Sequence, residues 1–241
     1  MREIRVYSPF TPQEKAVVEL SESASGHLGR VLRIKPGQPI TIFNGEGISY
    51  QATVIEVSKK HVLVQLEKEN TTNTESPLHT HLGQCLSRGE RMDFAIQKAT
   101  EMGVSEITPL FSERCEVKLS GERIKKRLSH WQQIIISACE QCGRNQLPII
   151  NSPQSLTDWL SQVQAEQKLV LHHRTNQTLQ SMNRPNSVAV LIGPEGGLSS
   201  NEIQAAEQQN FSSLTMGPRV LRTETAPIAV LALLQAQWGD F

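Results

Sequence analysis

Short apolar segments alternate with polar positions over the first part of the chain. They read IRVYS (4–8), AVVELS (16–21), PITIFN (39–44), SYQATVIEV (49–57) and HVLVQL (61–66), with Pro-Gly and Asn-Gly pairs among the residues between them. Runs of this kind, bounded by turn residues, predict β-strands, and together they predict a small β-barrel or sandwich. Residues 25–37 differ, because Leu28, Val31 and Leu32 recur at helical spacing beside basic residues and predict a short helix.

The pattern changes after a polar segment, EKENTTNTESP (67–77), which has no hydrophobic period and resembles a linker. We therefore expect two domains, residues 1–72 and residues 73–241. In the second, strand-like runs alternate with helical patterns. The strand-like runs are 78–86, 106–111, 168–173, 187–193 and 212–217, and the helical patterns are 89–103, 121–142, 155–164, 200–209 and 225–238. Such alternation predicts an α/β domain with a mostly parallel sheet covered by helices.

A glycine-rich loop, GPEGG (193–197), follows one of these runs. Glycine permits positive φ and a close approach of the main chain to a ligand, and ligands of open α/β sheets bind where strands end. Ser199 and Glu202 form the S-x-x-E pattern of a helix capping box. The segment is typical of a ligand-binding loop or of a tight structural turn. The chain contains neither G-x-x-x-x-G-K-[ST] nor G-x-G-x-x-G, so a standard nucleotide fingerprint is excluded.

A polar segment, 219–225, forms a second candidate loop. It lies between a strand ending at Met216-Gly217-Pro218 and an apolar helical pattern with Pro227 near its start. Proline is well tolerated in the first turn of a helix. Arg222 and Glu224 are therefore charged residues between two segments that should be buried. Paired charges in such a place indicate a functional site, and the alternative is a structural ion pair that closes the loop.

The composition indicates the cellular compartment of the protein but does not indicate the class of its binding partner. The 24 basic and 24 acidic residues cancel, so overall charge favours no class of partner. The N-terminal residues contain no apolar signal region, and no run approaches the ~20 apolar residues of a membrane span, which predicts a cytoplasmic protein. The four cysteines are too few for a disulfide scaffold and should be free thiols. Cys139 and Cys142 have no second pair, so we expect helix packing and no metal site.

Several motifs taken together resemble a known family. They are GHLGRVLRIKPGQPITIFNGEG (26–47), QKATEMGV (97–104), SERCEV (112–117), CEQCGRNQLP (139–148), LIGPEGG (191–197) and MGPRVLRTETA (216–226). In this order they are similar to the SPOUT-type, trefoil-knotted RNA methyltransferases, specifically the RsmE family. That family makes 3-methyluridine in small-subunit ribosomal RNA. The motifs span nearly the whole chain, and GPEGG together with RVLRTETA is the specific part of the resemblance.

The resemblance implies an N-terminal PUA-like β-barrel that binds RNA and a C-terminal SPOUT α/β domain with a deep trefoil knot. It also implies S-adenosylmethionine as cofactor, held by three loops that follow consecutive strands. The implied cofactor-binding residues are Leu171, His172, Ile192, Gly193, Pro194, Glu195, Gly196, Gly197, Leu214, Met216, Gly217, Leu221, Arg222, Thr225 and Ala226. The glycines of the opening loop would then let main-chain groups approach the cofactor.

The same resemblance implies a homodimer whose interface includes the apolar helix 227–238, and 16S ribosomal RNA or the small ribosomal subunit as partner. Basic residues that would contact this RNA lie in both halves. They are Arg2, Arg5, His27, Arg30, Arg33, Lys35, Arg88, Arg114 and Arg144, with Arg91 and Lys98 as a possible extension. Each of these charges taken singly is also compatible with a solvated surface position.

Methylation of uracil N3 requires alignment with the methyl group and loss of the N3 proton. We expect Arg222 to stabilise the developing negative charge, and Glu224 or Glu195 to orient Arg222 or accept the proton. N3 is hidden in a base pair, so the uridine must be unpaired or flipped out. Two alternatives stay open: a SPOUT methyltransferase acting on another RNA position, and a non-catalytic RNA-binding factor in ribosome assembly.

Overall fold

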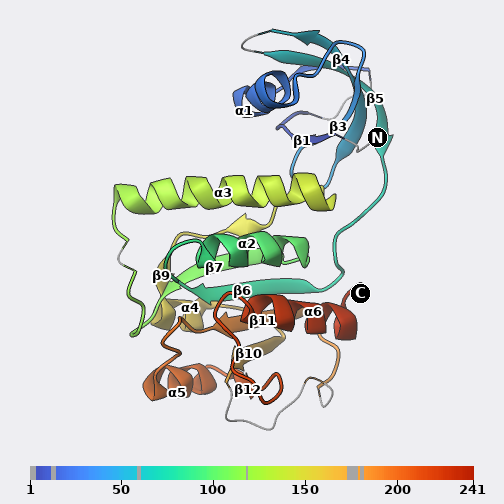
Figure 1. Ribbon diagram of the computed structural model, residues 1–241. Helices are drawn as coiled ribbons and strands as arrows, with labels where there is room; N and C mark the ends of the chain where they lie inside the picture. The colour runs from blue at the N-terminus through green and yellow to red at the C-terminus, as the bar shows by residue number, and fades with distance from the viewer. Residues whose placement is uncertain (1–3, 12–14, 59–60, 118, 173–178, 180–181) are drawn as a thin grey trace. The chain divides into compact units, whose positions relative to one another are not determined.

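The computed structural model describes the chain except for residues 1–3, 12–14, 59–60, 118, 173–178 and 180–181 (Figure 1). It divides into two compact bodies. The first comprises Met1–Glu75 and Cys139–Leu147, and the second comprises Ser76–Ala138 and Pro148–Phe241. The first body is therefore built from two separate stretches of sequence.

The first body is a mixed five-stranded sheet with the order β1-β3-β4-β5-β2. Its strands are β1 (Arg5–Tyr7), β2 (Val17–Glu19), β3 (Pro39–Phe43), β4 (Ser49–Val57) and β5 (Val62–Asn70). β1 runs parallel to β3, and the other pairs are antiparallel. The predicted short helix is present as α1 (Glu22–Gly26) followed by the π-helical turn η1 (His27–Leu32). Leu28 is fully buried against Ile42 and Val54 in the core, while Val31 and Leu32 are exposed.

The segment Cys139–Leu147 is held in the first body by specific hydrogen bonds. The guanidinium of Arg5 donates to the carbonyl of Gly143 at 3.1 Å and to Asn145 Oδ1 at 2.7 Å. Arg144 Nη2 lies 2.6 Å from Glu75 Oε2, and the Leu147 amide donates to the Gly45 carbonyl. These bonds give the CEQCGRNQL stretch a structural role that its spacing alone did not indicate.

The second body is a parallel sheet with the order β12-β10-β11-β6-β7-β8, and β9 also pairs with β7. The strands are β6 (His79–Cys85), β7 (Glu106–Phe111), β8 (Ile149–Ile150), β9 (Gln154–Ser155), β10 (Gln167–Leu171), β11 (Ser187–Ile192) and β12 (Ser212–Leu214). Every pairing among these strands is parallel. The expected α/β sheet is confirmed, and β8 and β9 are short strands that the hydrophobic pattern did not predict.

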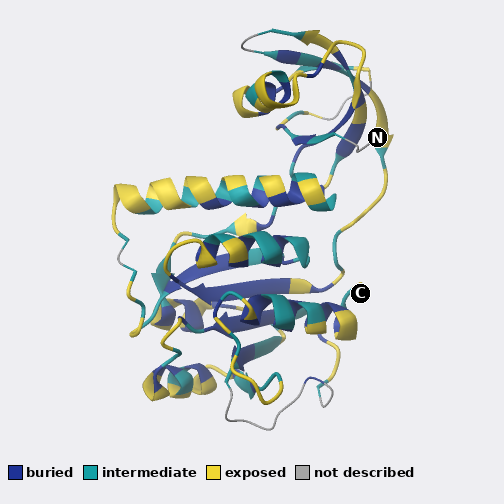
Figure 2. Cartoon of the chain, viewed as in Figure 1, coloured by how far each residue is buried: buried dark blue, intermediate teal, exposed yellow. Residues whose placement is uncertain are grey.

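Five helices accompany this sheet: α2 (Arg91–Glu101), α3 (Glu122–Cys142), α4 (Leu156–Gln162), α5 (Ser200–Gln208) and α6 (Ala226–Trp238). Figure 1 shows α2 and α4 on opposite sides of the strands. The central strands are buried along most of their length (Figure 2). The indole of Trp159 in α4 lies directly on Gly83 of β6, where a Cβ atom would stand 2.5 Å from the ring. The sheet can accept this large side chain only because residue 83 is glycine.

A closed polar cluster lies beside Trp159. His81 Nε2 is 2.8 Å from Thr108 Oγ1, and the Trp159 indole N–H donates to the same imidazole nitrogen at 3.2 Å. Asn151 Nδ2 donates to Glu106 Oε1 at 2.6 Å and to Thr108 Oγ1 at 2.8 Å. Burial lowers the pKa of His81, with the Glu106 carboxylate acting in the opposite direction. The cluster joins β6, β7 and α4 through paired polar atoms.

The described residues also bear on two smaller expectations. All four cysteines are free thiols, as expected, and burial raises the pKa of Cys85 and of Cys139 to about 12. No helix in the described part of the chain has the length and apolar character needed to cross a membrane. The trefoil knot stays a prediction.

Candidate functional site

A cavity of about 540 Å³ lies where three neighbouring strands of the second body end. Leu171, Ile192 and Leu214 are the last residues of β10, β11 and β12, and all three line it. This is the carboxyl edge of the parallel sheet, where ligands of open α/β folds bind. Its volume falls in the range of about 300–1,000 Å³ that is typical of small-molecule sites.

The glycine loop forms one wall of the cavity. Gly197 has φ of +67°, a conformation that glycine adopts without steric cost. The predicted capping box then starts α5: the Ser199 hydroxyl accepts from the Glu202 amide, and the Glu202 carboxylate accepts from the Ser199 amide. Glu202 also accepts a hydrogen bond of 2.8 Å from the Glu113 amide. The cap therefore fixes both the glycine loop and the segment that follows β7.

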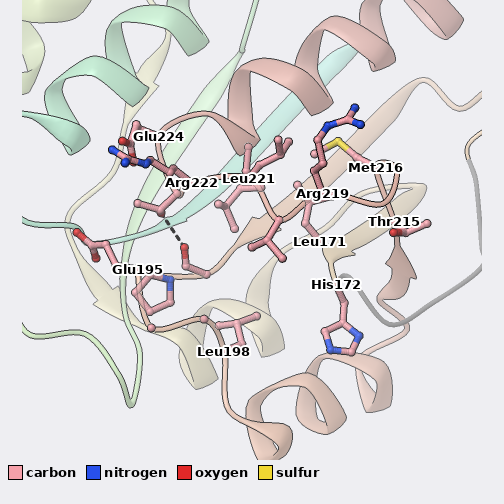
Figure 3. A pocket seen from close by; sticks show the side chains of 18 of the residues that line it. Leu171, His172, Glu195, Leu198, Thr215, Met216, Arg219, Leu221, Arg222 and Glu224 are labelled. Atoms are coloured by element: carbon pink, nitrogen blue, oxygen red, sulfur yellow. Dashed lines mark hydrogen bonds between the residues drawn. The ribbon is translucent and has the colours of Figure 1, made fainter.

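A threonine joins the glycine loop to the second polar loop. The Thr223 hydroxyl donates to the Gly193 carbonyl at 2.8 Å, drawn as the dashed line in Figure 3, and accepts from Gln84 Nε2 at 3.1 Å. Thr223 and Gln84 are both buried, with exposed fractions of 6% and 1%. Gln84 belongs to β6, so the two loops are held against the central sheet by one hydroxyl.

Glu195 is engaged by basic residues. Its Oε1 accepts from the Arg88 amide at 3.0 Å and from Arg91 Nη1 at 2.8 Å. Partial burial disfavours its charge, but hydrogen bonds from its own main-chain amide, from Arg88 and from Arg91 outweigh this and lower the pKa of Glu195. A carboxylate with a lowered pKa and these donors is an anchor for Arg91 and a weak proton acceptor.

Glu224 and Arg222 are differently placed. Glu224 Oε1 lies 4.0 Å from Arg91 Nε, whereas its Oε2 is buried and has no hydrogen-bond partner within the described residues. Arg222 is exposed and lines the cavity, and no ion pair to its guanidinium is found in the described part of the chain. Figure 3 shows Glu195, Arg222 and Glu224 at one end of the pocket and His172 with Thr215 at the other. An acceptor and a cation are thus available at one end.

Arg114 reaches the glycine loop from the segment after β7. Its Nη1 donates to the Gly196 carbonyl at 2.9 Å, and a Cβ atom on residue 196 would stand 3.3 Å from Arg114 Cβ. Gly196 therefore allows the Arg114 side chain to approach the loop closely. This contact places Arg114, which we expected to bind RNA, in the wall of the cavity.

The structure brings nearly all of the expected cofactor residues together. Those that line the cavity are Leu171, His172, Ile192, Gly193, Pro194, Glu195, Gly196, Gly197, Leu214, Met216, Gly217, Leu221, Arg222 and Ala226. Thr225 does not line it and precedes the first residue of α6 as its N-cap. Leu198 and Ile203 also line the cavity and lie outside the three predicted loops. Thr215, Arg219, Val220 and Thr223 line it within the third loop, 214–226, which the sequence indicates only as a whole. Thr223 lies in the RTETA motif, so its position between two charged residues was a signal that could have been used.

The residues expected to contact RNA differ in their exposure and in their partners. His27, Arg30, Arg33 and Lys35 are exposed on the first body, and Arg88 is exposed in an ion pair with Glu116. Arg5 and Arg144 are engaged in the hydrogen bonds and ion pair that hold residues 139–147. Arg2 lies outside the described residues. Lys98 is paired with Glu101 at 2.8 Å on α2. The exposed set on the first body is the one free to meet a polyanion.

No group of three or more His, Cys, Asp or Glu side chains in the described part of the chain is arranged to hold a metal ion. The cavity instead combines an apolar floor with main-chain groups and a few charges. Leu171, Ile192, Leu214 and Leu221 offer apolar surface, and Glu195 and Glu224 offer negative charge. Arg91, Arg114, Arg219 and Arg222 also line it, so the lining carries charge of both signs and fits a ligand with apolar and charged parts.

Two family models match the chain. One, described as an RNA methyltransferase domain, matches residues 74–235, and the other, described as an RNA methyltransferase PUA domain, matches residues 20–67. The ribosomal RNA small subunit methyltransferase E of Buchnera aphidicola (Schizaphis graminum) is 38% identical over 98% of this chain and 97% of its own length. The enzyme of the same name from Bacillus subtilis is 28% identical, over 88% of this chain and 86% of its own length.

Solved structures of similar proteins match along the full length. A methyltransferase of Legionella pneumophila, in complex with S-adenosylmethionine, superposes with a TM-score of 0.97 at 44% identity, covering 100% of both chains. The ribosomal RNA small subunit methyltransferase E of Neisseria gonorrhoeae, also bound to S-adenosylmethionine, superposes with a TM-score of 0.94 at 39% identity, again covering 100% of both.

Proposed function

This chain belongs to the RsmE family of RNA methyltransferases, with a PUA and a methyltransferase domain, and from that premise we propose that it methylates N3 of a specific uridine in 16S ribosomal RNA. It is an S-adenosylmethionine-dependent ribosomal RNA methyltransferase. The choice of chemistry is supported by two residues that line the same cavity: the cation Arg222, and Glu224, whose buried Oε2 has no hydrogen-bond partner within the described residues.

The cavity at the carboxyl edge fits the cofactor. Main-chain groups of the loop 193–197 and of the loop that follows β12 would hold its polar parts, and the apolar residues at the strand ends would hold the adenine. When bound, S-adenosylmethionine supplies an electrophilic methyl group on a sulfonium. Thr223 keeps the two loops in register through its bonds to Gly193 and Gln84, so the cavity is shaped before the ligand arrives.

Arg222 and Glu224 have different roles toward the uracil base. N3 forms a bond to the methyl carbon, the carbon–sulfur bond breaks, and the electron pair of that bond stays on sulfur. The N3 proton passes to the carboxylate of Glu224, whose Oε2 has no hydrogen-bond partner within the described residues. Arg222 donates hydrogen bonds to a neighbouring uracil carbonyl, where negative charge develops as the proton leaves.

Glu195 has a separate role in this proposal. Hydrogen bonds from Arg88 and Arg91 already occupy one of its oxygens and lower its pKa, so it serves to fix Arg91 between the two carboxylates. Glu195→Gln should weaken positioning, whereas Glu224→Gln should remove the proton acceptor.

The exposed basic residues His27, Arg30, Arg33 and Lys35 of the first body would contact the phosphates of the RNA. We also propose a homodimer. In support of it, Leu233 of α6 is 48% exposed and Phe94 of α2 is 43% exposed, on two helices that pack together. Apolar surface of this kind on neighbouring helices favours contact with a second copy.

The test is a methyl-transfer assay with the purified protein, labelled S-adenosylmethionine and small ribosomal subunits from a strain that lacks the modification. Digestion of the RNA should yield label in 3-methyluridine. Label in another nucleoside would overturn the assignment of base and atom. Cofactor binding without transfer to either the particles or protein-free 16S RNA would favour a non-catalytic assembly factor.

A further inference from the structure

The first half of α3 carries a strong excess of positive charge that the site described above does not use. The sequence ERIKKR places Arg123, Lys125, Lys126 and Arg127 within one and a half turns, and all four are exposed. The one acid in this stretch, Glu122, pairs with Lys125 at 2.9 Å. Within the described residues, no carboxylate forms an ion pair with the other three. The chain as a whole has a net charge of zero, so this segment concentrates positive charge locally.

Three of these cations lie on one side of α3. Residues three and four apart are neighbours on a helix, so Arg123, Lys126 and Arg127 lie on the side that continues to His130. His130 Nε2 is 2.7 Å from Asp93 Oδ2 in the first turn of α2. The indole N–H of the buried Trp131 donates to the other oxygen of Asp93 at 3.1 Å. Asp93 thus fixes the rotation of α3.

Two arginines near α3 in the sequence or on its neighbour α2 reach the cavity. Arg91, two residues before Asp93 on α2, lines the cavity and donates to Glu195. Arg114, in the segment that leads into α3, donates to the Gly196 carbonyl in the cavity wall. Cations are therefore present at the cavity and on α3, and Asp93 of α2, two residues from Arg91, joins α2 to α3 at His130.

We infer that the face formed by Arg123, Lys126 and Arg127 binds the sugar–phosphate backbone of the substrate RNA next to the target nucleotide; this inference rests on the proposed function. Three uncompensated cations on a rigid helix match a polyanion, because neutralising phosphates releases counterions. A basic amphipathic helix can instead bind a membrane surface, but that requires a free apolar face. In α3 this face is in the core, where Trp131 and Ile135 are buried.

The experiment compares the triple variant R123Q/K126Q/R127Q with K125Q, which removes a cation from the same helix that is already paired with Glu122. Glutamine is a good helix former, so α3 should persist. Affinity for protein-free 16S RNA and for small subunits lacking the modification is measured by filter binding between low and moderate salt. The dissociation constant for S-adenosylmethionine is measured by calorimetry and should be unchanged in both variants.

We expect the triple variant to bind both RNA substrates about tenfold more weakly at moderate salt, with a salt slope smaller by about 2, as expected for three single-strand phosphate contacts. K125Q should match the wild type. An unchanged slope in the triple variant would overturn the inference. A loss seen with the particles and absent with protein-free RNA would also overturn it, since the partner would then be a protein. Binding is measured without methyl transfer, so absence of 3-methyluridine with the wild type would count against the proposed function alone.

Discussion

Two polar regions of the second body, one around His81 and one around Gln84, lie three residues apart along β6. They differ in whether their buried polar side-chain atoms have hydrogen-bond partners. The cluster around His81 pairs its polar side chains with one another, and none of its atoms is among the buried side-chain atoms left without a partner in the described residues. At the carboxyl edge, Gln84 Oε1 and Glu224 Oε2 are both buried and unpartnered. Native structures rarely leave such atoms unpaired. Among the residues with such atoms in the described part of the chain, only Glu224 also lines the cavity, and this combination points to a ligand there.

Residue type alone does not identify a functional site. The closed cluster contains histidine, glutamate and threonine, which are also the components of many catalytic groups, yet each is used to hold β6, β7 and α4 together. The open edge contains threonine and glutamate as well, but there the loops leave a cavity and unpaired charge. Polar groups without hydrogen-bond partners beside a cavity therefore distinguish the candidate functional region from the structural cluster.

The largest effect should come from Arg222→Ala, which removes the cation assigned to the developing charge. Turnover should fall by about 100-fold to 1,000-fold, as found when one donor to a developing anion is lost. The dissociation constant of the cofactor should change by less than about threefold. Single-turnover methylation and calorimetry measure the two quantities.

Arg184→Ala is the matched control for this variant. Arg184 is exposed and lies just before β11, at the opposite end of the strand from the cavity. Its loss should leave turnover unchanged. An equal loss of turnover and cofactor affinity in Arg222→Ala would show that Arg222 binds the cofactor and has no separate catalytic role.

The second prediction concerns stability in the closed cluster. Thr108→Val keeps the shape of a fully buried side chain but removes the hydroxyl that meets both His81 and Asn151. Loss of a buried partner costs about 1–3 kcal/mol, and each kcal/mol lowers Tm by about 2–4 °C in a protein of this size. Thermal unfolding should show this decrease, while kcat/KM at low temperature stays at the wild-type value. A fall in kcat/KM of the folded protein would mean that the cluster supports the site.

The third prediction applies the same substitution to the open edge. Thr223→Val removes the hydroxyl between Gly193 and Gln84, so the two loops lose their shared bond. Affinity for S-adenosylmethionine should fall about tenfold, which corresponds to about 1.4 kcal/mol. Calorimetric titration measures it, and Thr223→Ser should restore most of the affinity. If Thr223→Val lowered Tm as Thr108→Val does and left the affinity intact, Thr223 would belong with the structural residues.

Much of this architecture could be predicted because it rests on local patterns. Helical periodicity in 121–142 and the Ser199–Glu202 capping box need only neighbouring residues, and the structure confirms both. The pairing of Arg5 with residues 143–145 could not be predicted, because it joins positions more than 130 residues apart in the sequence. Arg5 and Arg30 are both arginines beside apolar runs. What distinguishes them is the acceptors that the fold brings to Arg5.

The same limit applies to the site. The two loops could be placed at strand ends from the alternation of strands and helices, but the choice between Glu195 and Glu224 could not be made. That choice depends on the donors Arg88 and Arg91, which come from a segment about 100 residues earlier in the chain. Sequence motifs thus indicate which residues lie in the site, whereas the folded structure determines which carboxylate has an oxygen without a hydrogen-bond partner within the described residues.

The smallest effect should be a change in acid stability from His81. Burial lowers the pKa of His81 below its ordinary value of 6.5, so the folded protein keeps the ring neutral when an unfolded chain would protonate it. Stability is therefore lost as the pH falls below about 6.5, with a slope of at most about 1.4 kcal/mol per pH unit from this group. His81→Gln keeps a donor and an acceptor but cannot titrate, so its stability should fall less steeply from pH 7.5 to pH 5.5 in urea unfolding. Equal slopes in wild type and His81→Gln would show that the closed cluster accepts the proton, and the contrast with the open edge would then rest on hydrogen-bond pairing alone.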